Sequence, residues 1–164
     1  MGQKRRHKGL SFLVLISLFS CGNKEGFDEQ KAISKEGLTP KAVVFEVPAQ
    51  ELNNSPQNIF IWLRNNPEYE FSNIFLIATL KVNNEIYIQD TLEYAMTAPD
   101  GSWLGKGFTE LKENKLWWKE GLVIPQEGPV QIEIAQAMRN NGKPEGVPKL
   151  KGIVSLGISI EDQQ

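Results

Sequence analysis

The stretch that decides the fold class is Val154-Ser155-Leu156-Gly157-Ile158-Ser159-Ile160, close to the end of the chain. Its apolar residues alternate with small or polar ones, so one side of the segment is apolar and the other is not. A period of two is typical of a half-buried β-strand. An earlier stretch shows a similar alternation, with an apolar face made by Val130, Ile132, Ile134 and Met138.

Short apolar runs separated by turn signals fill the rest of the chain after Pro40. The runs lie at 43–47, 58–64, 71–81, 86–96 and 108–119, and most of them end at a proline, an Asn-Asn pair or an Asp-Gly pair. Apolar residues do not keep a helical spacing over three turns anywhere. We therefore predict an all-β protein whose residues 41–164 form a single β-sandwich of jelly-roll type, with about seven or eight strands.

The first 20 residues have the layout of a secretory signal peptide. Four basic residues precede an apolar run of ten residues, 10–19, and the small residue Ser20 stands before Cys21. The run is too short to span a bilayer, which takes roughly 20 residues. A cysteine at this boundary resembles the bacterial lipobox, in which the thiol is joined to diacylglycerol. We favour a lipoprotein signal over residues 1–20 with lipidation at Cys21; the alternative is an ordinary signal with an incidental cysteine.

The segment after the signal is polar and charged. Residues 22–40 hold seven charged side chains among glycines, and we predict a lipidated tether over residues 21–40. Phe27, Ile33 and Leu38 leave a second interpretation open, in which part of this segment docks on the domain.

Removal of the signal changes the chemistry that is available. The formal net charge falls from −2 to −6, because four basic residues and no acidic ones are removed. An acidic domain argues against binding to nucleic acid and against a basic membrane-binding patch.

The residue types left in the mature domain exclude several kinds of site. The only histidine, His7, lies in the signal, and Cys21 is the only cysteine. The mature domain therefore lacks the residues of nucleophilic triads, common zinc sites and redox thiols. We expect a non-enzymatic protein with no cofactor, no metal and no small-molecule substrate.

Two aromatic segments suggest a surface for a partner. Trp103-Leu104-Gly105-Lys106-Gly107 follows an Asp-Gly turn, and its glycines permit close approach by a partner; the alternative is a bulged hairpin end with Trp103 on the core. Neighbouring side chains of a strand face opposite ways, so one of Trp117 and Trp118 is expected to leave the core. Exposed aromatic side chains are common at interfaces; the alternative is a local cap over a small surface cluster. The candidate partner surface is Trp103, Lys106, Trp117 and Trp118.

Two arginines, Arg64 and Arg139, each end an apolar run just before an Asn-rich turn. They are candidates to pair with Asp90, Glu93 or the carboxylates of a partner. A structural hydrogen-bonding role is the alternative interpretation of both.

A three-residue motif, Asp90-Thr91-Leu92, has the form of a bacterial O-glycosylation acceptor. It lies inside a predicted strand, and modification of Thr91 stays a hypothesis. The glutamates between positions 68 and 120 are scattered, and they form no evident general acid–base pair.

With these segments in order, the chain resembles the gliding-motility lipoprotein GldH family of Bacteroidetes bacteria, from the lipobox to about Glu161. The most specific matching blocks are Arg64-Asn65-Asn66, Asp90-Thr91-Leu92, Trp103-Leu104-Gly105-Lys106-Gly107 and Gln136-Ala137-Met138-Arg139. The resemblance implies a lipid-anchored envelope protein required for gliding, which works with other lipoproteins and with the type IX secretion machinery. It implies no catalytic activity, and Cys21 is the only site that it carries over.

These observations leave functions from different classes open. The leading hypothesis is a non-enzymatic lipoprotein that contacts other envelope proteins; Gly22 provides no inner-membrane retention signal, which favours the outer membrane. The alternative is a carbohydrate-binding lipoprotein module that uses exposed tryptophans. A hydrolase with two catalytic carboxylates is a more distant third.

Overall fold

Residues 26–163 are described by the computed structural model, and they form eight strands and one short 3₁₀-helix. The strands are β1 (Phe27–Ala32), β2 (Val43–Val47), β3 (Gln57–Asn65), β4 (Asn73–Val82), β5 (Glu85–Ala95), β6 (Lys112–Leu122), β7 (Val130–Gln136) and β8 (Ile153–Asp162). The 3₁₀-helix η1 spans Ala49–Glu51. The prediction of an all-β domain is confirmed.

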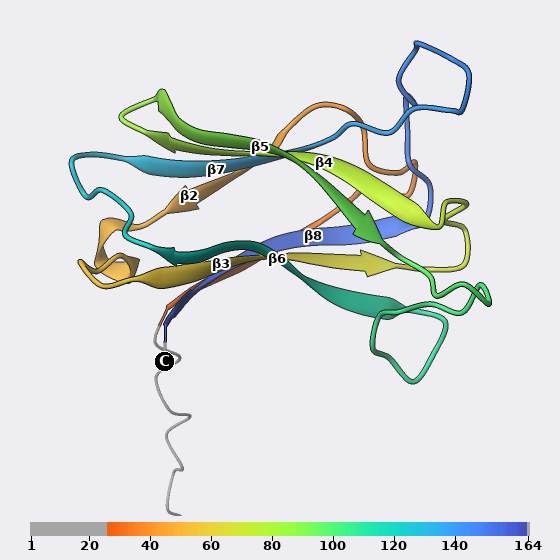
Figure 1. Ribbon diagram of the computed structural model, residues 1–164, viewed down its shortest axis with the longest axis horizontal. Coiled ribbons are helices and arrows are strands. Elements are labelled where there is room, and N and C mark those ends of the chain that lie inside the picture. The colour runs from red at the N-terminus through yellow and green to blue at the C-terminus, as the bar shows by residue number, and fades with distance from the viewer. Residues whose placement is uncertain (1–25, 164) are drawn as a thin grey trace, which may run out of the picture.

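The strands form two antiparallel sheets that stack face to face (Figure 1). The first sheet has the order β1-β8-β3-β6, and the second has the order β2-β7-β4-β5. This arrangement confirms the predicted sandwich. Strands β5 and β6 are the edges on one side of the sandwich, and the shorter strands β1 and β2 are the edges on the other.

The core lies between the sheets and is made by the inward side of each strand. On β8 the alternation places Leu156, Ile158 and Ile160 fully inside. A register shift against β3 near the start of β8 makes Val154 the extra residue, so that Ile153 faces the core in its place. The period of two therefore predicts the buried residues of β8 correctly from Leu156 onward, and it fails at Val154 because of this bulge.

The segment predicted as a tether contributes a strand. Strand β1 pairs with β8, in register from Phe27 opposite Ile160 to Ala32 opposite Ser155, and Phe27 and Leu38 are buried. The prediction of a tether therefore does not hold from Phe27 on, and the second interpretation, in which part of this segment docks on the domain, is the observed one. An edge strand needs few apolar residues, because its charged side chains reach solvent, and this is why the segment has a polar composition.

The connections gather at the two ends of the sandwich (Figure 1). The proximal end, as we call it, holds Gly26, the end of β8, and the connections 48–56, 83–84 and 123–129. The distal end holds the connections 33–42, 66–72, 96–111 and 137–152. Strand β6 begins at Lys112 and not at residue 108 as predicted, so the connection before it is long. We call residues 97–111 the distal loop.

Candidate functional site

The two neighbouring tryptophans lie on opposite sides of β6, as strand geometry predicts. Trp118 is 6% exposed and faces the interior, whereas Trp117 is 47% exposed and faces solvent. Of the two tryptophans predicted for the partner surface, only Trp117 is therefore on the surface, and Trp118 is an inner residue.

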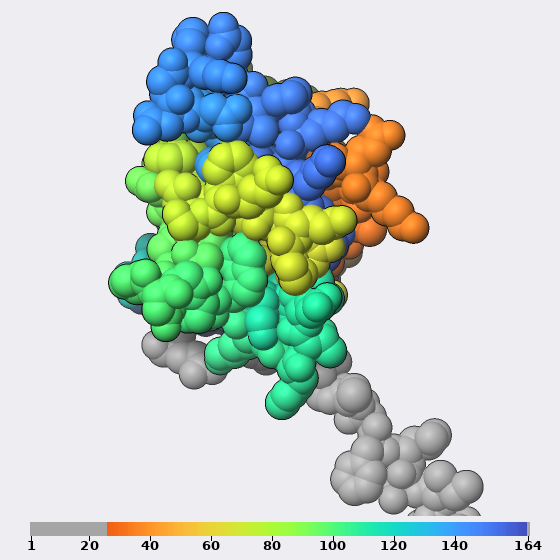
Figure 2. All heavy atoms as spheres, turned by 90° about the vertical axis from the view of Figure 1, so that its right-hand side faces the viewer, coloured from red at the N-terminus to blue at the C-terminus, as the bar shows by residue number. Residues whose placement is uncertain are grey.

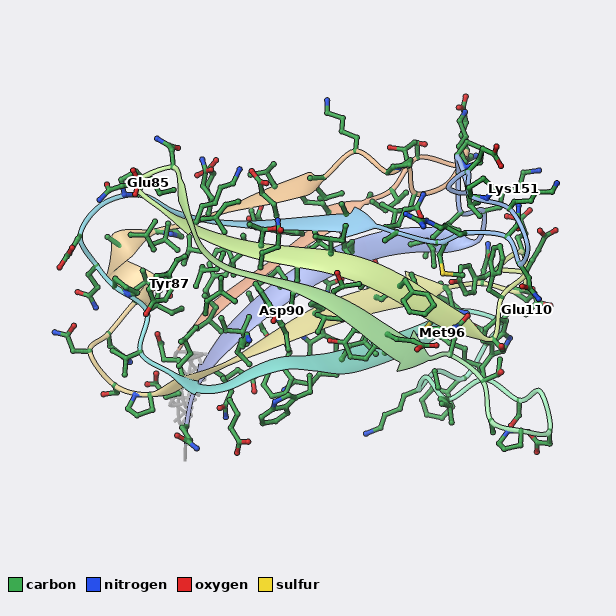
Figure 3. All side chains as sticks on the ribbon, turned by 45° about the horizontal axis from the view of Figure 1, so that its top comes forward. Glu85, Tyr87, Asp90, Met96, Glu110 and Lys151 are labelled. Atoms are coloured by element: carbon green, nitrogen blue, oxygen red, sulfur yellow. The ribbon has the colours of Figure 1, made fainter. Side chains whose placement is uncertain are left out.

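Trp118 closes the side of the sandwich where the edge strands β5 and β6 of the two sheets face each other. The indole Nε1 of Trp118 donates a hydrogen bond to Asp90 Oδ2 on β5 at 2.9 Å, and Lys119 Nζ lies 2.9 Å from the same oxygen. The hydroxyl of Tyr94 on β5 donates to the backbone carbonyl of Trp117 at 2.6 Å. Asp90, labelled in Figure 3, thus joins the edge strands of the two sheets. This closure gives Trp118 a structural role.

The ionisation of this junction follows from its contacts. Partial burial raises the pKa of Asp90, but the hydrogen bonds from Lys119 and Trp118 and the charge of Lys119 together outweigh it, so the pKa lies below its ordinary value. Burial, and then the charge of Asp90, raise the pKa of Tyr94 to about 12. At neutral pH the carboxylate is therefore charged and the phenol is a hydrogen-bond donor.

The outer face of β6 belongs to a second aromatic cluster that the sequence did not single out. The ring of Trp117 meets Phe60 edge to face, with 4.7 Å between centroids. Lys115 Nζ lies 3.9 Å from the Phe60 centroid and 5.4 Å from that of Trp62. The same ammonium is 2.7 Å from a carboxylate oxygen of Glu161. We call Phe60, Trp62, Lys115 and Trp117 the outer cluster.

The register of β3 against β6 explains the outer cluster, and knowledge of that register would have been enough to predict it. Trp117 is opposite Phe60 and Lys115 is opposite Trp62 in the β3–β6 pair, and cross-strand neighbours on one face touch. The Trp62 indole also donates to Ser159 Oγ at 2.9 Å. Alternation along β3 places Phe60 and Trp62 outward, but the sequence does not specify which strand pairs with β3.

The distal loop holds the other two predicted surface residues, Trp103, which packs inward, and Lys106, whose side chain is exposed. Trp103 packs on Tyr69, with 6.3 Å between ring centroids, and it contacts the core. Lys106 forms a pair of backbone hydrogen bonds with Glu113, both 2.8 Å long, and its side chain is exposed. Trp103 therefore packs on the core, as the alternative interpretation expected, but the loop joins strands of different sheets and is not the end of a β5–β6 hairpin.

Gly105 is required by close approach. A Cβ at this position would lie 2.8 Å from Asn114 Oδ1, which is closer than real Cβ contacts permit, and 3.0 Å from the Glu113 carbonyl oxygen, which is tight. Asn114 is itself held, because its amide donates to Asn65 Oδ1 at 3.0 Å and to the Leu63 carbonyl at 3.3 Å. The motif therefore lets the distal loop lie against the start of β6.

Beyond this tie the loop projects from the distal end, and Figure 2 shows it as a green-to-teal lobe. Two of its apolar side chains point to solvent there: Leu111 is 40% exposed and Phe108 is fully exposed. We call these two residues the apolar tip. Leu104 is 54% exposed but lies before the tie, where its amide donates to the Met96 carbonyl at 3.0 Å. Lys112 Nζ donates to the Gly107 carbonyl at 2.9 Å, which fastens the loop at its base. An ordered projection with an apolar tip is typical of a contact surface.

The four predicted surface residues thus lie in three environments. Trp118 is in the β5–β6 closure, Trp117 is in the outer cluster, and Trp103 and Lys106 belong to the distal loop. The structure brings only the last two together, within one loop.

The other predicted residues have mainly structural contacts. Arg64 pairs with Glu113 across the β3–β6 ladder at 2.5 Å and not with Asp90 or Glu93. Arg139 is exposed, forms a β-bridge with Gly146 and makes no ion pair within residues 26–163. Thr91 is exposed on β5.

Two general observations bear on the chemistry. Within residues 26–163, no three side chains of His, Cys, Asp or Glu are grouped as metal ligands would be. No helix in this part of the chain is long and apolar enough to cross a membrane. Cys21, the predicted lipidation site, lies outside the described residues.

Comparison with known proteins agrees with the sequence blocks quoted above. The profile of the GldH lipoprotein family matches residues 27–160. The gliding motility lipoprotein GldH of Flavobacterium johnsoniae is 38% identical over 158 residues, which cover 96% of this chain and 98% of that protein. A gliding motility lipoprotein GldH homolog of Christiangramia forsetii is 42% identical over 151 residues, or 92% of each chain.

Among solved structures, dimeric latent PorU from Porphyromonas gingivalis aligns with 84% of this chain and 13% of that chain. The sequence identity is 12% and the TM-score is 0.31, so no argument rests on this likeness. The match of the family profile and the two relatives are sufficient: this chain belongs to the GldH lipoprotein family.

Proposed function

We propose that this protein is a non-enzymatic, lipid-anchored component of the outer membrane that acts in gliding motility and with the type IX secretion machinery. It works by contacting other envelope proteins through the distal loop. Family membership makes the protein a membrane-anchored lipoprotein of the cell envelope. The observation that carries the proposal is the apolar tip on an ordered loop at the distal end.

The position of the tip suits an anchored protein. Cys21, the proposed lipid attachment point, is five residues before Gly26, a span of at most about 17 Å. The chain enters the fold at the proximal end, and β8, which has ten residues, extends about 33 Å from there to the distal end. An anchor at Cys21 would therefore hold the proximal end near the membrane and present the distal loop away from it.

The energetics favour a contact at the tip. Burial of a Phe or Leu side chain contributes about 1.5–3 kcal/mol relative to exposure. The backbone pair between Lys106 and Glu113 and the bond from Lys112 hold the loop before any partner arrives, so little ordering entropy is lost on binding. Attachment of both proteins to one membrane raises their effective concentration, and a weak contact then suffices.

The test is a double substitution, Phe108→Ser with Leu111→Ser, in the full-length lipoprotein produced in a gliding strain that lacks its own GldH. We expect loss of colony spreading and of secretion, with unchanged circular dichroism and unchanged membrane fractionation. The control is the double substitution Ile86→Ser with Val123→Ser, because both residues are apolar and exposed, at 59% and 46%, and both lie at the proximal end. Normal gliding and secretion in the double variant would refute the distal contact.

A carbohydrate-binding role is the second candidate, and one observation favours it: Trp117 presents a half-exposed ring on the outer face of the first sheet. Aromatic rings on sheet faces can stack on sugars. Affinity electrophoresis on polysaccharides decides the matter, because only this function predicts retardation that Trp117→Ala abolishes.

A further inference from the structure

A groove lies at the proximal end of the first sheet, on its outer side and separate from the distal loop. Its volume is about 720 Å³, and its lining includes Trp62, Asn58 and four carboxylates. A smaller hollow of about 190 Å³ adjoins it, and both share Gly26 and Asp162. The two hollows lie beside each other at the end of β8, and we call them together the proximal groove.

The lining of the proximal groove is strongly acidic. Its carboxylates in the larger part are Asp28, Glu120, Glu161 and Asp162, and among the described residues that line it there is no lysine or arginine. Glu161 alone has an ion-pair partner, Lys115. Asp28 and Glu120 are exposed and make no ion pair within residues 26–163. The groove thus has an excess of negative charge that a cationic ligand would neutralise.

A buried acceptor without a donor lies at the same place. Asp162 Oδ1 accepts hydrogen bonds from Asn53 Nδ2 at 2.6 Å and Gln57 Nε2 at 3.1 Å. A carboxylate only accepts, so Gln57 must direct its amide nitrogen toward Asp162 and its oxygen elsewhere. Gln57 is fully buried and lines the smaller hollow, and its Oε1 has no hydrogen-bond donor among the described residues. A buried acceptor beside the smaller hollow therefore lacks a donor.

The outer cluster shows how this face holds a cation. The ammonium of Lys115 lies over the rings of Phe60 and Trp62 and against the carboxylate of Glu161. Aromatic faces and carboxylates together stabilise ammonium and guanidinium groups. Trp62 also lines the proximal groove, so a second cation in the groove would meet the same combination of an indole and carboxylates.

We infer that the proximal groove binds a basic segment of a partner protein, whose lysine or arginine side chains lie between Trp62 and the unpaired carboxylates and reach toward Asp162. Guanidinium and ammonium groups carry donors only, which suits the carboxylates of the groove. A neutral sugar would leave the excess charge in place. This surface adds a second contact to the one at the distal loop and does not depend on it.

The test measures binding of a fluorescent penta-arginine peptide to the full-length mature lipoprotein in nanodiscs of neutral lipid, by fluorescence anisotropy at about 0.1 M salt. The groove variant combines Asp28→Asn with Glu120→Gln. The control variant combines Glu85→Gln with Glu110→Gln, which are exposed residues of the opposite sheet and of the distal loop, labelled in Figure 3. Both variants change the net charge equally.

We expect the groove variant to weaken binding by at least about tenfold and the control variant by less than about twofold, since only close charge pairs give large coupling. Equal weakening in both variants would show a net-charge effect and overturn the site. Unchanged affinity in the groove variant would also overturn the site. Displacement of the labelled peptide by a neutral oligoglucan, seen as a fall in anisotropy, would overturn it as well. The substitutions at Phe108 and Leu111 should leave peptide binding unchanged, so failure of the distal contact is distinguishable from failure of this one.

Discussion

The inner and outer sides of β6 show how one strand serves two purposes. On the inner side, Trp118 and Asn114 are buried and direct hydrogen bonds to groups on β5 and β3. On the outer side, Trp117 and Lys115 lie on the sheet face, where solvent reaches them. The inner side therefore determines stability, and the outer side can change its contacts without unfolding the protein. The following predictions test that division.

The largest effect is expected from Trp118→Ala. Removal of a buried indole leaves a cavity and takes one of the two hydrogen-bond donors from Asp90, so the free energy of unfolding should fall by about 3–5 kcal/mol. Urea denaturation followed by circular dichroism measures it. Trp118→Phe keeps most of the volume and isolates the lost bond to Asp90, for which about 1–2 kcal/mol is expected. A loss as small as that of Trp117→Ala would contradict the inner role.

Gly105→Ala should follow, with a loss of about 1–3 kcal/mol, because the new methyl group would force the distal loop away from Asn114. Denaturation midpoints give the effect. Gly146→Ala is the control, since the nearest atom that its Cβ would meet, the Met138 carbonyl oxygen, is 3.6 Å away and its φ is not positive. Equal losses in the two variants would show that the approach to Asn114 is not what the glycine permits.

Trp117→Ala should cost only about 1 kcal/mol, the size of an edge-to-face aromatic pair at a surface. The same denaturation experiment applies, and the far-ultraviolet spectrum should not change. A loss above about 3 kcal/mol would mean that the outer cluster is part of the core.

The smallest effect is the loss of stability at acidic pH that comes from protonation of Asp90. Because the folded pKa of Asp90 lies below its ordinary value of 3.8, its ionised form stabilises the fold. This contribution is complete above pH 3.8 and is lost as the pH falls through the lower folded pKa. Thermal melts of the wild-type protein and of Asp90→Asn should therefore differ at pH 6 and converge once the pH has fallen below the lowered pKa of Asp90. A constant difference across this range would assign the effect to something other than the charge.

Alternation in the sequence predicted most of the fold. Strands β2, β3, β5 and β7 lie within one or two residues of the predicted runs, since a buried face requires a regular apolar period. Strand β1 was missed because Phe27 is its only large apolar residue. The start of β6 was placed too early because Phe108 is apolar, although it is fully exposed.

The candidate site was less predictable, because it depends on pairing between distant strands. Trp117 and Trp118 were correctly expected to face opposite ways, but their neighbours Phe60 and Asp90 come from β3 and β5. The pairing of Arg64 with Glu113 likewise depends on the register of β3 against β6. Residue type and spacing along one strand do not contain this information.

The pairing of β1 with β8 has a mechanical consequence. If the proposed lipid anchor at Cys21 were pulled against the proposed partner at the distal loop, the force would act along the strands. Phe27 to Ala32 would then be drawn lengthwise past β8, and all six residue pairs between the two strands would resist together. Strands pulled in this direction separate far less readily than strands peeled apart one bond at a time, so the first strand of the fold would act as a mechanical clamp.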